Sequence, residues 1–361
     1  MADIRSAAGQ LLIMGFDGNS LDEHLRGMLA EIQPGGVILF ARNIESARQT
    51  HTLLEGCQQA ITTPAFLCVD MEGGMVDRLK TVVYPAPAAA DVFATADRLL
   101  FWEHGRVIGN ECRALGFNTD FAPVLDLAYP ASKNVLGSRA VSPDPKGTAI
   151  YAAHFLRGLA AARVIGCGKH FPGLGEARLD THHELPTITK PWKKLWMEDL
   201  APYRALRAKL PFVMVAHAAF PGVTKGATPA SLSTKWIGEI LRKTIGYRGL
   251  VVSDDLEMGG VLAAASIEDA AIQTLYAGAD IYLVCHSQKH VASTYEAVVK
   301  ESERDHRFAA LVEERARRVL KYKKKVGRWL KQSPPPTAKK IAQLRSQMKK
   351  FEDAVHHRLA F

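Results

Sequence analysis

The sequence has no long hydrophobic run and no cysteine pattern that would cross-link it. None of its apolar stretches reaches the roughly 18 residues that a membrane-spanning helix needs, so no membrane span is expected. The N-terminus, residues 1–5, lacks the basic segment followed by an apolar stretch and a small-residue cleavage site that marks a secretory signal, which favours a cytoplasmic location. The 5 cysteines are odd in number and show no Cys-x-x-Cys spacing. We therefore expect buried, reduced thiols, and neither a disulfide framework nor a zinc site.

Glycine-rich phosphate-binding motifs are also missing. Neither Gly-x-Gly-x-x-Gly nor Gly-x-x-x-x-Gly-Lys-Ser/Thr follows an apolar run of strand length. A doubly wound sheet with a nucleotide site is therefore disfavoured.

Basic residues are concentrated near the C-terminus. Residues 315–361 hold 15 Lys/Arg and 2 Asp/Glu, whereas residues 1–314 hold 31 basic and 35 acidic side chains. The main body is thus mildly acidic, although the net charge of the chain is +9. Since a basic helix is more often a solvated face than a binding surface, nucleic acid is not an expected partner.

Short apolar runs alternate with helical patterns through most of the chain. We predict strands at Leu11–Phe16, Gly36–Phe40, Ala65–Asp70, Asn118–Val124, Val164–His170, Phe212–His217, Leu250–Asp254 and Asp280–Cys285. Helical patterns between them include Glu45–Ile61, Ala94–Leu115, Pro145–Ala162, Trp192–Lys209, Thr234–Ile245 and Ser266–Ala277. This alternation predicts an α/β fold, a single (β/α)8 TIM-type barrel, which typically takes about 250 residues plus insertions. The stretch Met71–Phe93 shows no clear helix and is the weakest repeat.

A C-terminal helical extension is expected after the barrel. A helix around Lys289–Lys300 would close the barrel, and Arg304–Lys331 has the pattern of one long helix. Three prolines at 334–336 then break the chain before a final helix, Ala338–Leu359. We divide the chain into a catalytic barrel (1–303), a long helix (304–332) and a Pro-rich link with a basic helix (333–361). No second domain of catalytic size is expected after them, and a monomer is favoured.

Polar side chains end several predicted strands, which is where a barrel places its active site. They are Asp70, followed by Glu72 and Arg78; Asp126, followed by Arg139; Lys169 with His170; His217; and Asp254 with Asp255. Because a barrel brings these ends together, they predict an enzyme site for a polar substrate of little or no charge. We expect Asp126 to bind substrate or to form a salt bridge with an arginine, and His217 to have a structural role.

The loop at residues 168–186 is the part of the sequence that is hardest to explain as scaffolding. It holds three glycines, two prolines, three histidines, two basic and three acidic residues within nineteen positions. A polar loop held by a buried strand is a common position for catalytic groups. We therefore predict that this loop carries the proton-transfer groups of an enzyme.

Glycoside cleavage suits these residues better than metal-dependent hydrolysis, because the His-x-His of barrel metallohydrolases is absent from the first strand end, residues 14–16. Cleavage needs a carboxylate at the oxocarbenium-like centre and an acid for the departing oxygen. Asp254 is the natural nucleophile. His182, with an unperturbed pKa of about 6.5, is a natural acid/base. Asp180 would orient the His182 imidazole, as an aspartate does in a triad.

At these residues the sequence resembles glycoside hydrolase family 3, in its β-N-acetylglucosaminidase branch. The matching motifs are Lys169-His-Phe-Pro-Gly-x-Gly175 with Asp180-x-His182, Ser253-Asp254-Asp255-Leu256-x-Met258, Asp70-x-Glu72-Gly-Gly-x-Val-x-Arg78, Phe121-Ala-Pro-Val-Leu-Asp126 and Asn134-Val-Leu-Gly-x-Arg139. They stand in the family's order, and the resemblance covers roughly residues 8–300.

The resemblance implies Asp254 as the nucleophile of a retaining mechanism, His182 as the general acid/base and Asp180 as its partner. Asp70, Arg78, Arg139, Lys169 and His170 would bind a terminal N-acetylglucosamine. It also implies a small carbohydrate substrate, GlcNAc-β-1,4-(anhydro)MurNAc or a muropeptide, as in peptidoglycan recycling, and no metal or other cofactor. The sequence departs from the branch at Leu174, Glu176, Met71 and Met75, which concern loop closure and the aglycone side.

Two alternative functions stay open at this point. One is an N-acetylglucosaminide phosphorylase on the same site, because a neutral histidine acid/base tolerates phosphate better than a carboxylate does. The other is a non-catalytic carbohydrate- or cell-wall-binding barrel that docks its basic tail on an anionic polymer.

Overall fold

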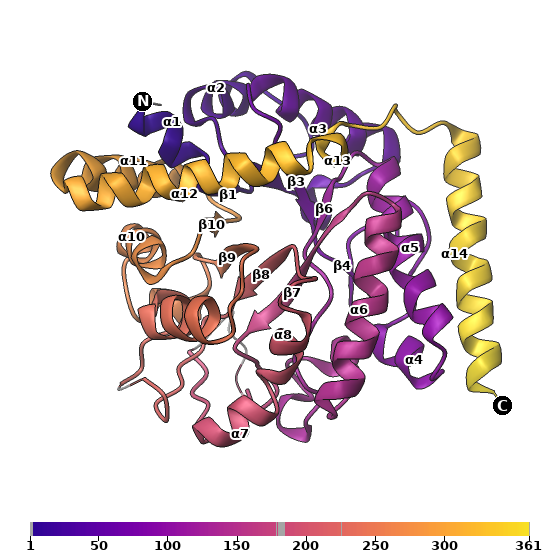
Figure 1. The fold of residues 1–361 in the computed structure, drawn as a ribbon. Coiled ribbons are helices and arrows are strands. Elements are labelled where there is room, and N and C mark those ends of the chain that lie inside the picture. Colours follow the sequence, from indigo (N-terminus) through magenta and orange to yellow (C-terminus); the bar gives the residue numbers. More distant parts are fainter. Residues whose placement is uncertain (1–2, 178, 180–184, 225, 361) are drawn as a thin grey trace.

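The computed structural model describes residues 3–177, 179, 185–224 and 226–360, which form a closed parallel barrel surrounded by helices (Figure 1). The barrel strands are β1 (Leu12–Met14), β2 (Gly36–Ile38), β3 (Phe66–Val69), β6 (Thr119–Asp120), β7 (Ile165–Phe171), β8 (Phe212–Val215), β9 (Leu250–Asp255) and β10 (Ile281–Val284). They follow one another around the barrel, and β10 closes it against β1. Each overlaps a predicted strand, so the predicted fold class is confirmed.

The barrel strands are buried on both faces. Every residue of β1, β2, β3, β8 and β10 is buried. Helices cover the outside of a parallel barrel and side chains fill its inside, which is why these strands are continuous apolar runs. At Gly36 the strands approach so closely that a Cβ would lie 2.4 Å from the carbonyl oxygen of Phe66.

Most of the surrounding helices begin at a residue whose side chain accepts a backbone N–H, the usual N-cap. The helices with such a cap are α1 (Ile4–Gly9), α2 (Glu23–Ile32), α3 (Ala47–Ala60), α5 (Arg98–Ala114), α6 (Pro145–Ala161), α10 (Ile267–Ala277), α11 (Gln288–Arg304), α12 (His306–Lys325) and α14 (Ala338–Leu359). The others include α4 (Ala89–Ala94), α9 (Gly259–Leu262) and the π-helical segment η5 (Lys235–Thr244). Short 3-10 turns are η1 (Ala41–Asn43), η2 (Pro130–Ser132), η3 (Gly137–Arg139) and η4 (Ala230–Leu232).

Three predicted helices differ in extent from the structure, and one of them, Ala94–Leu115, begins only at Arg98 of α5. Trp192–Lys209 forms two helices, α7 (Trp192–Met197) and α8 (Ala201–Leu206). Pro202 explains the break, because proline has no N–H and fits only the first turn of a helix. Arg304–Lys331 begins later and breaks near Gly327, giving α12 and the short α13 (Gly327–Leu330).

The stretch without a clear helical pattern contains a hairpin. β4 (Met71–Gly73) and β5 (Val76–Asp77) pair antiparallel directly after β3, and α4 follows them. The hairpin is an insertion at the carboxyl end of β3, so it lies at the face where the strand ends converge.

α12 closes the opposite end of the barrel (Figure 1). Tyr322 of α12 packs edge-on against Phe212, the first residue of β8, with ring centroids 5.7 Å apart. Lys323 is 3% exposed, its Nζ donates to Oε1 of Gln10 at 2.8 Å, and it lies 5.1 Å from the centroid of Phe66, the first residue of β3. The amino ends of the strands are therefore covered.

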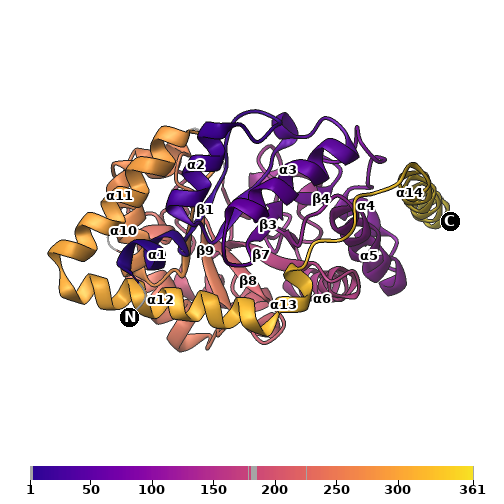
Figure 2. The same cartoon turned by 90° about the horizontal axis from the view of Figure 1, so that it is seen from above.

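The terminal helix α14 forms with its predicted bounds and lies apart from α12, against α5 and α4 (Figures 1 and 2). Its buried side chains, Leu344, Met348, Phe351 and Val355, recur at helical spacing and make one apolar face. Among the described residues we find no helix with the length and apolar character that crossing a bilayer requires.

Burial lowers the pKa of Lys323 to about 7, against an ordinary lysine value of about 10.4. Between these values the unfolded chain binds a proton at Lys323 that the folded chain does not bind. The free energy of unfolding should therefore fall as pH drops from 10 to 7. Lys323→Met should lose this part of the pH dependence and be more stable than the wild type at pH 7 by about 1 to 3 kcal/mol.

Urea unfolding at pH 7 and pH 9.5 measures this difference. Lys324→Met, a change at an exposed lysine next to it, is the matched control and should follow the wild type. The same pH dependence in all three proteins would contradict the prediction.

Candidate active site

A cavity of about 330 Å³ lies at the carboxyl ends of the barrel strands. Six of the predicted site residues line it: Asp70, Arg78, Arg139, Lys169, His170 and Asp254. They come from segments up to 184 residues apart, and the barrel brings them together as expected. Asp180 and His182 lie outside the described residues, so the structure does not test their placement.

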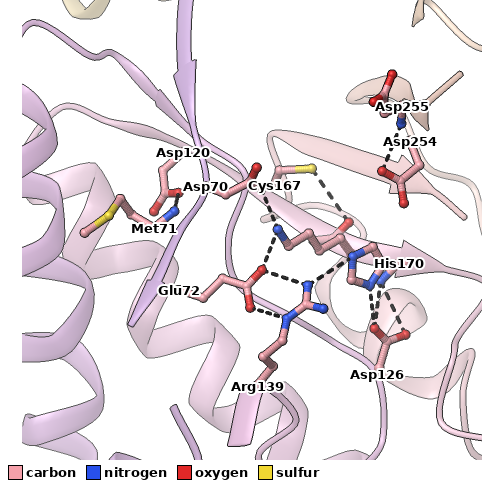
Figure 3. A network of polar contacts seen from close by, with 12 residues as sticks. Asp70, Met71, Glu72, Asp120, Asp126, Arg139, Cys167, His170, Asp254 and Asp255 are labelled. Atoms are coloured by element: carbon pink, nitrogen blue, oxygen red, sulfur yellow. Dashed lines mark hydrogen bonds and ion pairs between the residues drawn. The ribbon is translucent and has the colours of Figure 1, made fainter. Parts of the chain in front are cut away.

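A chain of ion pairs forms one wall of this pocket. The Lys169 Nζ lies 2.7 Å from Oδ1 of Asp70 and 2.6 Å from Oε1 of Glu72. Arg139 binds the same Glu72 carboxylate with two donors, Nε at 2.8 Å and Nη2 at 2.9 Å (Figure 3). The Glu72 carboxylate therefore bridges two cations, and the fork of Arg139 fixes its plane.

These groups stay charged although they are buried. Burial alone would lower the pKa of Lys169, but Asp70 and Glu72 outweigh it and the pKa is raised. Burial would raise the pKa of Glu72, but Arg139 and Lys169 outweigh it and hold the pKa well below its ordinary value. The wall thus offers preorganised charged donors and acceptors to a polar ligand.

His170 is oriented by a buried aspartate. Its Nδ1 lies 2.6 Å from Oδ2 of Asp126, and Asp126 Oδ1 also accepts the backbone N–H of Leu174 at 2.7 Å. The other ring nitrogen, Nε2, lies 3.4 Å from Nη2 of Arg139. The partner of Asp126 among the described residues is therefore His170 and not the expected arginine, while binding of substrate by Asp126 stays a prediction.

Asp254 lies across the site from the Glu72–Arg139 pair, with His170 between them (Figure 3). Its Oδ1 accepts the backbone N–H of Asp255 at 2.9 Å. Burial raises the pKa of Asp254, but His170, His217 and this N–H outweigh it, so the pKa lies below its ordinary value. Asp254 is therefore an anion at neutral pH, as a nucleophile has to be.

The neighbouring Asp255 is occupied by contacts within the protein. Its Oδ1 accepts the backbone N–H groups of Glu257 and Cys285, each at 3.1 Å, and its Oδ2 lies 3.3 Å from Nε2 of His286. His217 has the structural role expected of it: its Nε2 lies 2.8 Å from the carbonyl oxygen of Asp255. Among the described residues, the Asp254 carboxylate therefore makes fewer contacts within the protein than the Asp255 carboxylate does.

Arg78 differs from the other cations of the site. It is half-buried, and no described carboxylate pairs with it. Its Nε is buried and has no hydrogen-bond partner in the part of the chain that the structure describes, while its guanidinium carbon lies 5.8 Å from the ring centroid of Phe40. A ligand that brings acceptors into the pocket would satisfy this arginine.

Sequence reasoning placed Glu72 and Asp126 among the polar residues at the strand ends, but it did not predict the ion pairs through which they organise the site. Glu72 stands in the same motif as Asp70, and the Gly-Gly that follows it marks the turn of the hairpin. The sequence Glu72-Gly-Gly could therefore have indicated that Glu72 lies in a hairpin beside the site. Asp126 and His170 are 44 residues apart in the sequence, and no local sequence pattern predicts that they pair.

Glu72→Gln should destabilise the protein by about 3 to 5 kcal/mol, because it leaves Arg139 and Lys169 short of a buried counter-charge. Urea unfolding at pH 7 measures this loss. Glu31→Gln, at an exposed position of α2, is the control and should change stability by less than about 0.5 kcal/mol. Equal effects of the two substitutions would show that the ion-pair wall is not a structural necessity.

Comparison with known proteins identifies the family of the chain. The family model described as "Glycosyl hydrolase family 3 N terminal domain" matches residues 3–322. A "Beta-hexosaminidase" of Bordetella avium (strain 197N) is 40% identical over 277 residues, which are 74% of this chain and 78% of that protein.

Two solved structures are also similar. One is a glycoside hydrolase family 3 beta-N-acetylglucosaminidase from Paenibacillus sp. str. FPU-7, with a TM-score of 0.89, 30% identity, and 98% of this chain and 69% of that chain covered. The other is native NagZ from Neisseria gonorrhoeae, with a TM-score of 0.74, 27% identity, and 94% and 97% covered. The chain therefore belongs to glycosyl hydrolase family 3, as its motifs predicted, and is a glycoside hydrolase of the β-hexosaminidase class.

Proposed function

We propose that the protein is a retaining exo-β-N-acetylglucosaminidase that removes terminal GlcNAc from peptidoglycan fragments such as GlcNAc-β-1,4-(anhydro)MurNAc. The observation that carries the proposal is the anionic Asp254 facing a pocket of fixed polar groups. A volume of about 330 Å³ suits one sugar ring rather than a chain, which supports attack at a terminal residue.

In this proposal Asp254 attacks the anomeric carbon while His182 gives its proton to the departing glycosidic oxygen. The C–O bond to the aglycone breaks and a glycosyl ester forms on Asp254. His182, now neutral, takes a proton from water, whose oxygen attacks the same carbon and releases Asp254. Asp180 would hold the His182 ring in the tautomer that these steps need.

The described ends of the 168–186 loop support an acid/base residue between them. Leu174 lines the pocket and is fixed by Asp126. At the other end, the backbone N–H of Ile188 donates to the carbonyl oxygen of Ala219 at 2.8 Å. Beyond it, the Lys190 Nζ lies 2.6 Å from Oδ2 of Asp199. The loop is therefore anchored on both sides, beginning at the pocket.

The sugar would be held by the polar wall. Asp70 and Lys169 present an acceptor and a donor for neighbouring hydroxyl groups, Arg78 and Arg139 present guanidinium donors, and His170 faces Asp254. Each has an atom in the pocket lining. Such a set suits a neutral, hydroxyl-rich ligand, because the charges of the wall are already balanced against one another.

The nucleophile can be identified by trapping. A fluorinated N-acetylglucosaminide with an activated leaving group should form a stable ester, and peptide mass spectrometry should place it on Asp254. Asp254→Asn should lower kcat by at least about 10³-fold, since a neutral carboxamide replaces the carboxylate nucleophile. Label on Asp255, or full activity of Asp254→Asn, would contradict the assignment.

The acid/base can be identified from leaving groups. His182→Ala should lower kcat/KM for a disaccharide substrate by about 10² to 10⁴-fold, because its alkoxide leaving group needs a proton. The loss should be much smaller for a nitrophenyl glycoside, whose leaving group departs without protonation. His183→Ala is the matched control. Equal losses on both substrates would reject His182 as the acid, and turnover that depends on inorganic phosphate would favour the phosphorylase.

A further inference from the structure

Three of the pocket residues, Glu72, Val76 and Arg78, come from the β4–β5 hairpin region rather than from a barrel strand. Ion pairs hold Glu72 in place, whereas no described carboxylate holds Arg78. The position of the Arg78 side chain therefore depends on the backbone of the hairpin and on its contact with the Phe40 ring.

The hairpin is tied to the chain segment that follows it, residues 79–88. The Asp77 carboxylate accepts the backbone N–H of Leu79 at 2.9 Å and that of Ala86 at 2.8 Å. In the reverse direction, the N–H of Gly74 donates to the carbonyl oxygen of Ala86 at 2.9 Å. Because Asp77 is buried, these bonds are shielded from water, and the hairpin and the 79–88 segment behave as one unit.

α14 fastens this unit from outside. Arg345 donates from Nε to the carbonyl oxygen of Val83 and from Nη2 to that of Val82, both at 3.0 Å. Tyr84 of the same segment donates its hydroxyl to Oε2 of Glu352 at 2.8 Å. These contacts join residues about 260 positions apart in the sequence.

A second contact joins α14 to the hairpin turn through α5. Phe351 stacks on the ring of His104, with centroids 5.5 Å apart. Nδ1 of His104 lies 2.8 Å from the Tyr151 hydroxyl. A Cβ at Gly73 would lie 3.0 Å from His104 Nε2, so the ring packs directly on the hairpin backbone. Burial lowers the pKa of His104 to about 3, so this ring is neutral in the apolar contact.

We propose that α14 is a positioning element of the sugar site: it fixes the 79–88 segment and, through it, the hairpin that carries Glu72 and Arg78. The inference rests on the proposed function in that a sugar occupies the pocket. α14 lies outside residues 3–322, which match the family model, so this role is additional to the matched part of the chain. A displacement of about 1 Å in a binding group is enough to weaken productive binding strongly.

The test uses Arg345→Ala and Tyr84→Phe in the full chain. Lys349→Ala is the control, because Lys349 is exposed on the same helix and carries the same charge. Steady-state kinetics with an aryl N-acetylglucosaminide should show KM about tenfold higher for Arg345→Ala, with kcat changed less than about threefold. The inhibition constant of free N-acetylglucosamine should rise by the same factor. Arg345→Lys, which keeps one donor, should recover part of the loss.

Hydrogen exchange without ligand gives a readout that does not depend on turnover. Exchange of the amides at 71–88 should be faster in Arg345→Ala and unchanged in Lys349→Ala. If KM, the inhibition constant and this exchange all match the wild type, the inference is overturned, even if the melting temperature falls.

Failure of the proposed function has a different signature. In that case the wild type shows neither turnover nor binding of N-acetylglucosamine, while exchange at 71–88 still decides whether α14 holds the hairpin. If Arg345→Ala does not fold, Tyr84→Phe tests the inference in its place, because it removes only one hydroxyl group. A KM and an exchange rate of Tyr84→Phe equal to those of the wild type would then count against the inference.

Discussion

The structure depends on one buried cation and the carboxylates around it. Lys169 projects from β7 and is 2% exposed, and such an ammonium group is stable only if it is paired and hydrogen-bonded. Its partners, Asp70 and Glu72, follow β3, and Arg139 comes from η3. Three separate segments must therefore meet at fixed positions before the charges balance. The groups that hold the pocket together are the same ones that face it, so binding and folding share one set of interactions.

The end of β9 shows how adjacent residues of one type acquire different roles. Asp255 accepts two backbone N–H groups and its carbonyl oxygen contacts His217, so it fixes the strand end. Among the described residues Asp254 makes one hydrogen bond, to the N–H of Asp255, and the nearby histidines help to keep it ionised. Contacts rather than residue type separate a structural aspartate from a candidate nucleophile. Sequence spacing alone leaves the two aspartates equal, whereas the resemblance to the family favours Asp254.

The barrel was predictable because its strands are buried on both faces, and burial leaves long apolar runs in the sequence. The pocket residues at the strand ends were predictable once the barrel was assumed, because a barrel brings the carboxyl ends of its strands together. Three features of the structure could not be predicted from the sequence. Pro202 splits a helical pattern whose periodicity continues across it. The hairpin strands have three and two residues, too few for a period. The partner of His170 is set by proximity in space, and Asp180 and His182 remain predictions from the motif.

In the C-terminal extension, the number of basic residues does not predict which of them bind the rest of the protein. Residues 315–361 carry a large excess of basic side chains, and a count treats them alike. In the structure Arg345 uses its planar fork to bind two successive carbonyl groups, which a lysine ammonium does less well, whereas Lys349 is solvated. α14 is attached by its apolar face around Met348, by the Arg345 guanidinium and by the Glu352 carboxylate, and the last two bind the segment behind the hairpin. Most basic side chains of α14 are exposed, Arg345 among them, so the contacts of Arg345, Glu352 and Phe351 rather than the excess charge connect the helix to the hairpin region.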